Sequence, residues 1–212
     1  MQPAERKMWR WIAFATVYFA ALTALVQLHA LRGFDYHTTF WLNSHGNRFM
    51  DWAMSLFTAT ATPELSVALC GALMIFLWWR FGWRPAACLL IAFVGGTLLE
   101  VVLKNCIIQP GTRGMINRYV FGEGWIHITL PYAYPSGHAF RAMLLSGAMA
   151  LWVMPRAAAF WWTLGGGAAI SRLYLGHHWT SDALGGVLLA AVLLMIIGTQ
   201  IKPRSKQPSC ST

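Results

Sequence analysis

The chain has 212 residues, of which 57% are hydrophobic and only 11% are charged. Because soluble domains carry about 25% charged residues, this composition excludes an ordinary soluble protein and indicates a membrane protein. The net charge is +9, but the basic residues form no single stripe or patch, which argues against nucleic-acid binding. The four cysteines lack the spacing of a metal site, so no metal and no cofactor is predicted.

Long apolar stretches recur along the sequence. A helix needs about 20 apolar residues to cross a hydrocarbon core of about 30 Å. Six stretches approach this length, near residues 11–31, 65–79, 85–103, 139–154, 157–170 and 183–201. The sequence therefore predicts an all-α fold, in which residues 1–212 form a single domain built as a six-transmembrane-helix bundle.

Two further patterns predict local structure around these spans. The first long loop, residues 33–63, mixes aromatic and polar side chains, which predicts an interfacial helix lying on the outer membrane surface. In the fifth span, Gly165, Gly166 and Gly167 stand between apolar flanks. Small residues let helices approach closely, so a tight helix contact is expected there.

The basic residues predict the orientation of the bundle. With six spans, one side receives the N-terminus, the two short even loops and the C-terminal tail, with Arg6, Lys7, Arg10, Arg80, Arg84, Arg156, Lys202, Arg204 and Lys206. Cytoplasmic segments are enriched in Lys and Arg. We therefore expect both termini in the cytoplasm and the opposite face in the periplasm or outside the cell.

Polar side chains collect at the outer ends of the last four spans. They form three clusters, which are Glu100 with Lys104 and Arg113, the sequence Pro-Ser-Gly-His at 135–138, and residues 171–182. Charged groups within membrane helices are costly and usually have a partner or a task. We expect the three clusters to converge on one site at the outer face.

The convergent residues could bind a phosphate ester. Lys104, Arg113 and Arg172 can surround its oxygens with positive charge. Ser136 precedes an apolar run, as a helix N-cap does, and Gly137 leaves the backbone amides of this turn open to an anion. These five residues are the predicted phosphate-binding set.

Two histidines and an aspartate could supply the reaction. His178 and Asp182 are four residues apart, so their side chains can meet on one helical turn. A carboxylate that holds one ring nitrogen leaves the other free to attack an electrophile. His138, from another span, could then protonate the leaving alcohol.

Three neighbouring residues have less specific patterns. Glu100 lies one turn before Lys104, which predicts a structural ion pair rather than a catalytic acid. Arg141 lies one turn behind His138 and could either extend to the interface or bind a second phosphate. His177 is predicted to be an interfacial polar neighbour, with a second phosphate contact as the alternative.

The motifs resemble those of the type 2 phosphatidic acid phosphatase superfamily, which includes glucose-6-phosphatase and vanadium haloperoxidases. The second motif matches residues 135–138, and the third matches Ser171-Arg172, His178 and Asp182. The resemblance implies that His138 protonates the leaving group and that His178 becomes phosphorylated with the help of Asp182. It also implies that no metal is required.

The first motif of that family is only partly present. Lys104 stands in the expected place, and the resemblance implies that it binds phosphate. The Arg of the motif falls on Gly111, while Arg113 follows two residues later and Arg118 is the alternative.

These observations together predict an enzyme, a metal-independent lipid phosphatase of the bacterial inner membrane. Its expected substrate is a membrane lipid phosphate cleaved through a phosphohistidine, and the resemblance suggests the phosphatidylglycerophosphate, phosphatidate or undecaprenyl diphosphate class. A lipid phosphotransferase that uses the same intermediate is the alternative. A channel, transporter or scaffold is disfavoured, because the spans carry few charges toward the cytoplasm. The lipid bilayer is the expected surrounding, and no oligomeric state is predicted.

Overall fold

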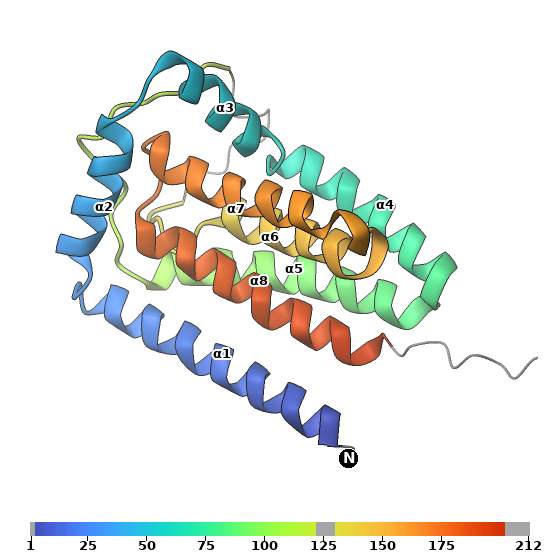
Figure 1. Cartoon of the computed structure of the whole chain (residues 1–212). Coiled ribbons are helices and arrows are strands. Elements are labelled where there is room, and N and C mark those ends of the chain that lie inside the picture. The colour runs from blue at the N-terminus through green and yellow to red at the C-terminus, as the bar shows by residue number, and fades with distance from the viewer. Residues whose placement is uncertain (1–2, 122–129, 202–212) are drawn as a thin grey trace, which may run out of the picture.

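The chain is a bundle of helices (Figure 1). The computed structural model describes residues 3–121 and 130–201, and every regular element within them is a helix. In chain order these are α1 (Pro3–Gln27), α2 (Arg32–Ser44), α3 (Arg48–Ala59), α4 (Pro63–Phe81), α5 (Trp83–Cys106), α6 (Gly137–Ala148), η1 (Met149–Val153), η2 (Pro155–Ala157), α7 (Ala158–Tyr174) and α8 (Thr180–Gln200). The predicted all-α class is confirmed.

Four of the helices are long and apolar enough to cross a membrane. They cover Glu5–Gln27, Pro63–Phe81, Trp83–Cys106 and Thr180–Gln200, and each corresponds to a predicted span. The fourth and fifth predicted spans are also helical, but α6 has 12 residues and α7 has 17. Helices therefore occur at all six predicted positions, while the count of six spans stays a prediction.

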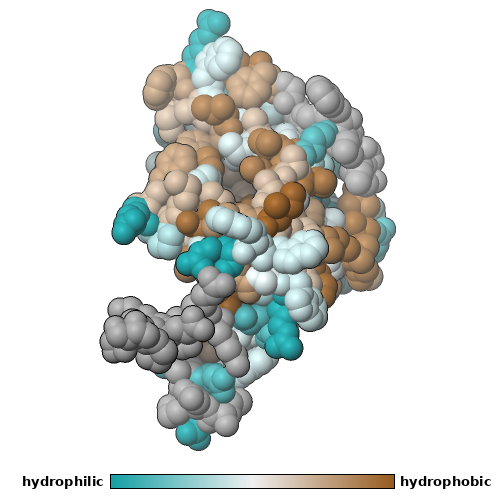
Figure 2. Space-filling model, turned by 90° about the vertical axis from the view of Figure 1, so that its right-hand side faces the viewer, coloured by the Kyte–Doolittle hydropathy of each residue, from teal (hydrophilic) through white to brown (hydrophobic). Residues whose placement is uncertain are grey.

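The outer surface of the bundle is largely apolar. Large side chains such as Trp79, Ile75 and Val17 are 81%, 72% and 65% exposed. Figure 2 shows one end of the bundle, where hydrophobic residues predominate and hydrophilic groups stand at a few separate places. In water such a surface would be strongly unfavourable, so it is the surface expected of a protein that faces lipid.

The segment between α1 and α4 contains two helices where the sequence predicted one interfacial helix. The chain leaves α2 at Ser44 and starts α3 at Arg48, and Asn47 caps α3 by accepting the Met50 N–H at 3.0 Å. An Asn cap favours a new helix start, which explains the break. Both helices lie at the same end of the bundle (Figure 1).

Small residues allow the central helices to pack closely. A Cβ added to Gly165 would lie 2.1 Å from the Ser146 hydroxyl, and one added to Gly167 would lie 2.6 Å from the Phe57 ring. The close contact predicted for this stretch is confirmed at these two positions, whereas Gly166 faces open space. The main core lies between α4, α5, α6 and α8, with residues such as Leu77, Leu89, Phe140, Leu144 and Ile197 fully buried.

The helix ends that carry the three predicted polar clusters lie at one end of the bundle. Figure 1 shows that α5 and α7 finish, and α8 begins, at the end where α2 and α3 lie. A backbone hydrogen bond from Ser136 N–H to the Asp182 carbonyl, at 2.9 Å, joins the start of α6 to the start of α8. The predicted basic tail with Lys202, Arg204 and Lys206 lies outside the described residues.

Candidate active site

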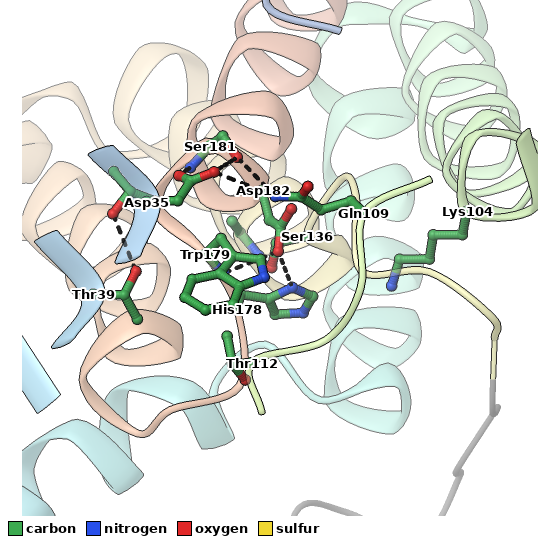
Figure 3. A network of polar contacts seen from close by, with 12 residues as sticks. Asp35, Thr39, Lys104, Gln109, Thr112, Ser136, His178, Trp179, Ser181 and Asp182 are labelled. Carbon is green, nitrogen blue, oxygen red and sulfur yellow. Dashed lines mark hydrogen bonds and ion pairs between the residues drawn. The ribbon is translucent and has the colours of Figure 1, made fainter. Parts of the chain in front are cut away.

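His178 and Asp182 form a buried pair at the start of α8. Gly176 adopts a φ of +81° after α7 and turns the chain, so that His178 precedes α8 and Asp182 lies in its first turn. Nδ1 of His178 lies 3.2 Å from Oδ2 of Asp182, and this oxygen also accepts the Trp179 N–H at 2.9 Å (Figure 3). Because Nδ1 is engaged, Nε2 is the ring nitrogen available for chemistry.

The surroundings of His178 favour its neutral form. Burial lowers its pKa well below the ordinary value of 6.5, and the positive charges of Lys104 and Arg172 lower it further. A neutral imidazole has a lone pair and can act as a nucleophile. Figure 3 shows the Lys104 side chain extending toward the His178 ring from α5.

His138 shares this environment from the start of α6. The charge of His138 acts on His178, and the charges of Lys104, Arg172 and His177 act on both rings. Nε2 of His138 is buried and has no hydrogen-bond partner among the described residues. The structure therefore brings both predicted catalytic histidines to one cationic region.

The start of α6 has the predicted cap. The Ser136 hydroxyl accepts the Ala139 N–H at 3.4 Å, and Ser136 itself is fully buried. Gly137 lies directly against Glu100, because a Cβ at this position would be 2.1 Å from Oε1 of that residue. The glycine is thus needed for close approach of α6 to α5, a reason that the sequence did not reveal.

Glu100 holds two of the positive charges. Its Oε1 lies 3.1 Å from Nζ of Lys104, which confirms the predicted ion pair, and its Oε2 lies 3.1 Å from a guanidinium nitrogen of Arg141. Arg141 therefore pairs with α5, which neither of its predicted roles included. All three side chains are largely buried, so the contacts fix the position of Lys104.

Arg172 is held by two residues that the sequence did not single out. One of its terminal nitrogens donates to the hydroxyls of Thr58, at 2.9 Å, and Tyr119. The guanidinium also lies 5.8 Å from the centre of the Tyr119 ring. Its Nε is buried without a hydrogen-bond partner among the described residues, so the guanidinium group still has an N–H that can bind an anion.

The two candidates for the missing first-motif arginine differ in their surroundings. Arg118 lies 3.5 Å from the Asp51 carboxylate, donates to the Asn43 carbonyl and covers the Tyr174 ring, so it holds α2, α3 and α7 together. Arg113 has an exposed side chain. The neighbouring Thr112 hydroxyl donates to the Gly176 carbonyl, which keeps this loop beside the His178 turn.

A buried polar stripe on α2 was also missed. Asp35, Thr39 and Asn43 are at most 2% exposed and follow one another at intervals of four residues. This spacing places them on one helix face, so the pattern was visible in the sequence even though its partners were not. Asn43 donates to the carbonyls of Ile116 and Tyr174, both at 2.8 Å.

Comparisons with known proteins agree with this geometry. A solved structure titled as the first transmembrane PAP2 type phosphatidylglycerolphosphate phosphatase from Bacillus subtilis matches with a TM-score of 0.72 and 19% identity, covering 89% of this chain and 94% of that one. Aquifex aeolicus LpxE matches with a TM-score of 0.63 and 16% identity, covering 78% and 95%. At these identities the likeness concerns the fold.

Sequence comparisons identify the family. An undecaprenyl-diphosphatase of Sulfolobus acidocaldarius is 28% identical over 144 residues, which cover 59% of this chain and 68% of that protein. The family model of the PAP2 superfamily matches residues 87–206, a range that begins in α5, contains both histidine motifs and extends beyond α8. Since this match covers more than half of the chain, the protein belongs to the PAP2 superfamily.

Proposed function

We propose that the protein hydrolyses the phosphomonoester or diphosphate of a membrane lipid, of the phosphatidylglycerophosphate, phosphatidate or undecaprenyl diphosphate class. The observation that carries the proposal is the placement of His178, oriented by Asp182, and His138 in one cationic region. The names of the relatives agree with this substrate class.

The reaction divides into two displacements at phosphorus. Nε2 of His178 attacks the phosphorus while the bond to the lipid oxygen breaks. His138, which can carry a proton once the phosphate anion offsets the cationic side chains around it, gives that proton to the lipid oxygen. Water then attacks the phosphohistidine, neutral His138 takes a proton from the water, and the phosphorus–nitrogen bond breaks to release inorganic phosphate. Asp182 stabilises the His178 ring in the required orientation.

Positive side chains and amides surround the transferred group. Lys104 and Arg172 supply positive charge beside the imidazoles, the start of α6 offers the amide of Gly137, and Arg113 would join the set from the loop, while the Ser136 N–H is already held by the Asp182 carbonyl. This arrangement supplies the charge that a divalent metal supplies in other phosphatases. We therefore expect activity in the presence of a chelator.

A cavity beside the site supports a lipid as the substrate. It has a volume of about 250 Å³ and lies between α4, α6 and α7, where Leu73, Phe76, Ala142, Leu145, Met149 and Trp161 line it. Ala142 is one helical turn beyond His138, and Thr60 at another wall is two residues from the Arg172 partner Thr58. An apolar chain could lie here while its phosphate occupies the cationic region.

The charge pattern supports an outward-facing site. Arg80 and Arg84 lie at the turn between α4 and α5, and Arg156 lies between α6 and α7, opposite the His178 end. The rule that basic loops remain inside then places the histidines outside, in a bundle of six spans. Cys106, exposed at the end of α5, should react with a membrane-impermeant maleimide in intact cells, and Cys106→Ser should abolish that labelling. If Cys106 were labelled only after cell lysis, the site would face the cytoplasm and the proposed orientation would be wrong.

The decisive experiment is phosphate release by purified protein in EDTA across a panel of lipid phosphates and prenyl diphosphates. At least one lipid should be cleaved, and His178→Ala should lower the rate by three or more orders of magnitude, as loss of a nucleophile does. Equal rates for this variant and the wild type would exclude the mechanism. Labelled phosphate on a second lipid, rather than in solution, would assign phosphotransfer instead of hydrolysis.

A further inference from the structure

Asp35 makes a dense set of hydrogen bonds to the start of α8. It lies on α2, is 2% exposed and belongs to none of the phosphatase motifs. Oδ1 accepts the Ser181 N–H at 2.8 Å, and Oδ2 accepts the Ser181 hydroxyl at 2.7 Å and the Gln109 amide at 3.3 Å (Figure 3). A buried carboxyl group is costly without hydrogen-bond partners, and these three donors supply them.

These contacts act directly beside the catalytic pair. Ser181 is the residue before Asp182, and both belong to the first turn of α8. The N–H groups of a first helical turn lack partners within the helix. Here Asp182 accepts the Trp179 N–H and Asp35 accepts the Ser181 N–H, so two carboxylates from different helices fix this turn.

The electrostatics of Asp35 agree with its burial. Burial raises the pKa of Asp35 above its ordinary value, and the hydrogen bonds from Ser181 and Gln109 oppose part of that rise because they favour the ionised carboxylate. Arg32, on the same helix as Asp35, has an exposed side chain.

We propose that Asp35 is a positioning residue of this active site. Its carboxylate holds Ser181, and through Ser181 it keeps Asp182 at hydrogen-bonding distance from His178. The kinetic part of this inference rests on the proposed phosphatase function.

The first test is the kinetics of Asp35→Asn. Asn has nearly the same shape, accepts the Ser181 N–H and can donate to the Ser181 hydroxyl, so the fold should be retained. We expect kcat to fall by about tenfold or more, as with other residues that orient a ligating or reacting side chain, while KM changes little. Asp51→Asn is the matched control, because Asp51 on α3 accepts the Tyr174 hydroxyl at 2.7 Å but does not touch α8. An unchanged kcat for Asp35→Asn, or an equal loss in the control, would overturn the proposal.

The route through Ser181 can be tested with a double-mutant cycle. If Asp35 acts through Ser181, Ser181→Ala should also lower kcat, and the double variant should be no worse than the poorer single one. If the two losses multiply, the residues act independently and the proposed route is wrong.

A third measurement does not need a substrate. If Asp35 holds the first turn of α8, the ring signals of His178 should shift or broaden in Asp35→Asn and stay unchanged in Asp51→Asn. NMR spectra of ring-labelled histidine report this, with His178→Ala used to assign the signal. Unchanged His178 signals in Asp35→Asn would refute the positioning role. If the wild type cleaves no lipid phosphate while these signals still change in Asp35→Asn, the phosphatase proposal fails and the positioning role stands.

Discussion

Replacing Gly137 by alanine should break the ion pairs that Glu100 makes with Lys104 and Arg141. A Cβ at this position would lie 2.1 Å from Oε1, 2.3 Å from Oε2 and 2.4 Å from Cδ of Glu100. Contacts this short cannot persist, so in Gly137→Ala the carboxylate must move. It now contacts Lys104 and Arg141, each at 3.1 Å, and both contacts would be lost or weakened.

The size of the effect follows from these two contacts. A hydrogen bond to a charged group contributes about 1.5–3 kcal/mol, so loss of both costs about 3–6 kcal/mol. Replacing a helical glycine by alanine returns about 0.5–1 kcal/mol. The net loss of about 2–5 kcal/mol corresponds to a fall in melting temperature of about 5–20 °C for a chain of this size.

Thermal unfolding of purified protein in detergent, followed by tryptophan fluorescence, measures this loss. Gly166→Ala is the matched control, because a Cβ at Gly166 has nothing within 4 Å and the same helix propensity is gained. Adding Glu100→Asp to Gly137→Ala should restore part of the stability, since the shorter side chain can retract. If Gly137→Ala melts as the control does and keeps its phosphatase rate, the close packing inferred at this position is wrong.

The site leads to four further expected outcomes. Because the pKa of His178 is lowered, its neutral form persists below pH 6.5, so the acid limb of kcat/KM should lie below that value. Folding stability should also decline below pH 6.5, where the unfolded chain binds a proton that the buried ring excludes; unfolding midpoints measured across pH test this sign. Arg172→Lys should lower kcat/KM by about 100-fold in phosphate-release assays, since one ammonium cannot replace the fork that bridges two hydroxyls and a phosphate. Arg113→Ala should raise KM without changing the melting temperature, whereas Arg118→Ala should lower the melting temperature by several degrees; the reverse pattern would exchange their roles.

The parts of the site that could be predicted are those set by local geometry. The spacing of His178 and Asp182, the cap at Ser136 and the pair of Glu100 with Lys104 each involve residues within four positions of each other. Helix geometry alone brings such residues together. The positions of the four long apolar helices, α1, α4, α5 and α8, followed in the same way from apolar runs.

The parts that could not be predicted depend on contacts between distant segments. Arg141 pairs with Glu100 across 41 positions, and Arg172 donates to Thr58 across 114. Asp35 reaches Ser181 across 146 positions. A polar stripe at intervals of four shows that a helix face will be buried, but only the packing of α2 against α7 and α8 identifies the partner.

The charges of the assembled site explain why it should favour a phosphate. Lys104 and Arg141 share the single carboxylate of Glu100, so these three groups retain one positive charge. Arg172 adds a second, and its described partners, the hydroxyls of Thr58 and Tyr119, are neutral. Because these cationic groups are largely buried, they can stabilise an anion such as a phosphate that enters the site. Both oxygens of Glu100 pair with cations, so this side chain offsets positive charge and is not available as an acid or base. Nε2 of His138 has no hydrogen-bond partner among the described residues, so His138 remains the candidate for proton transfer.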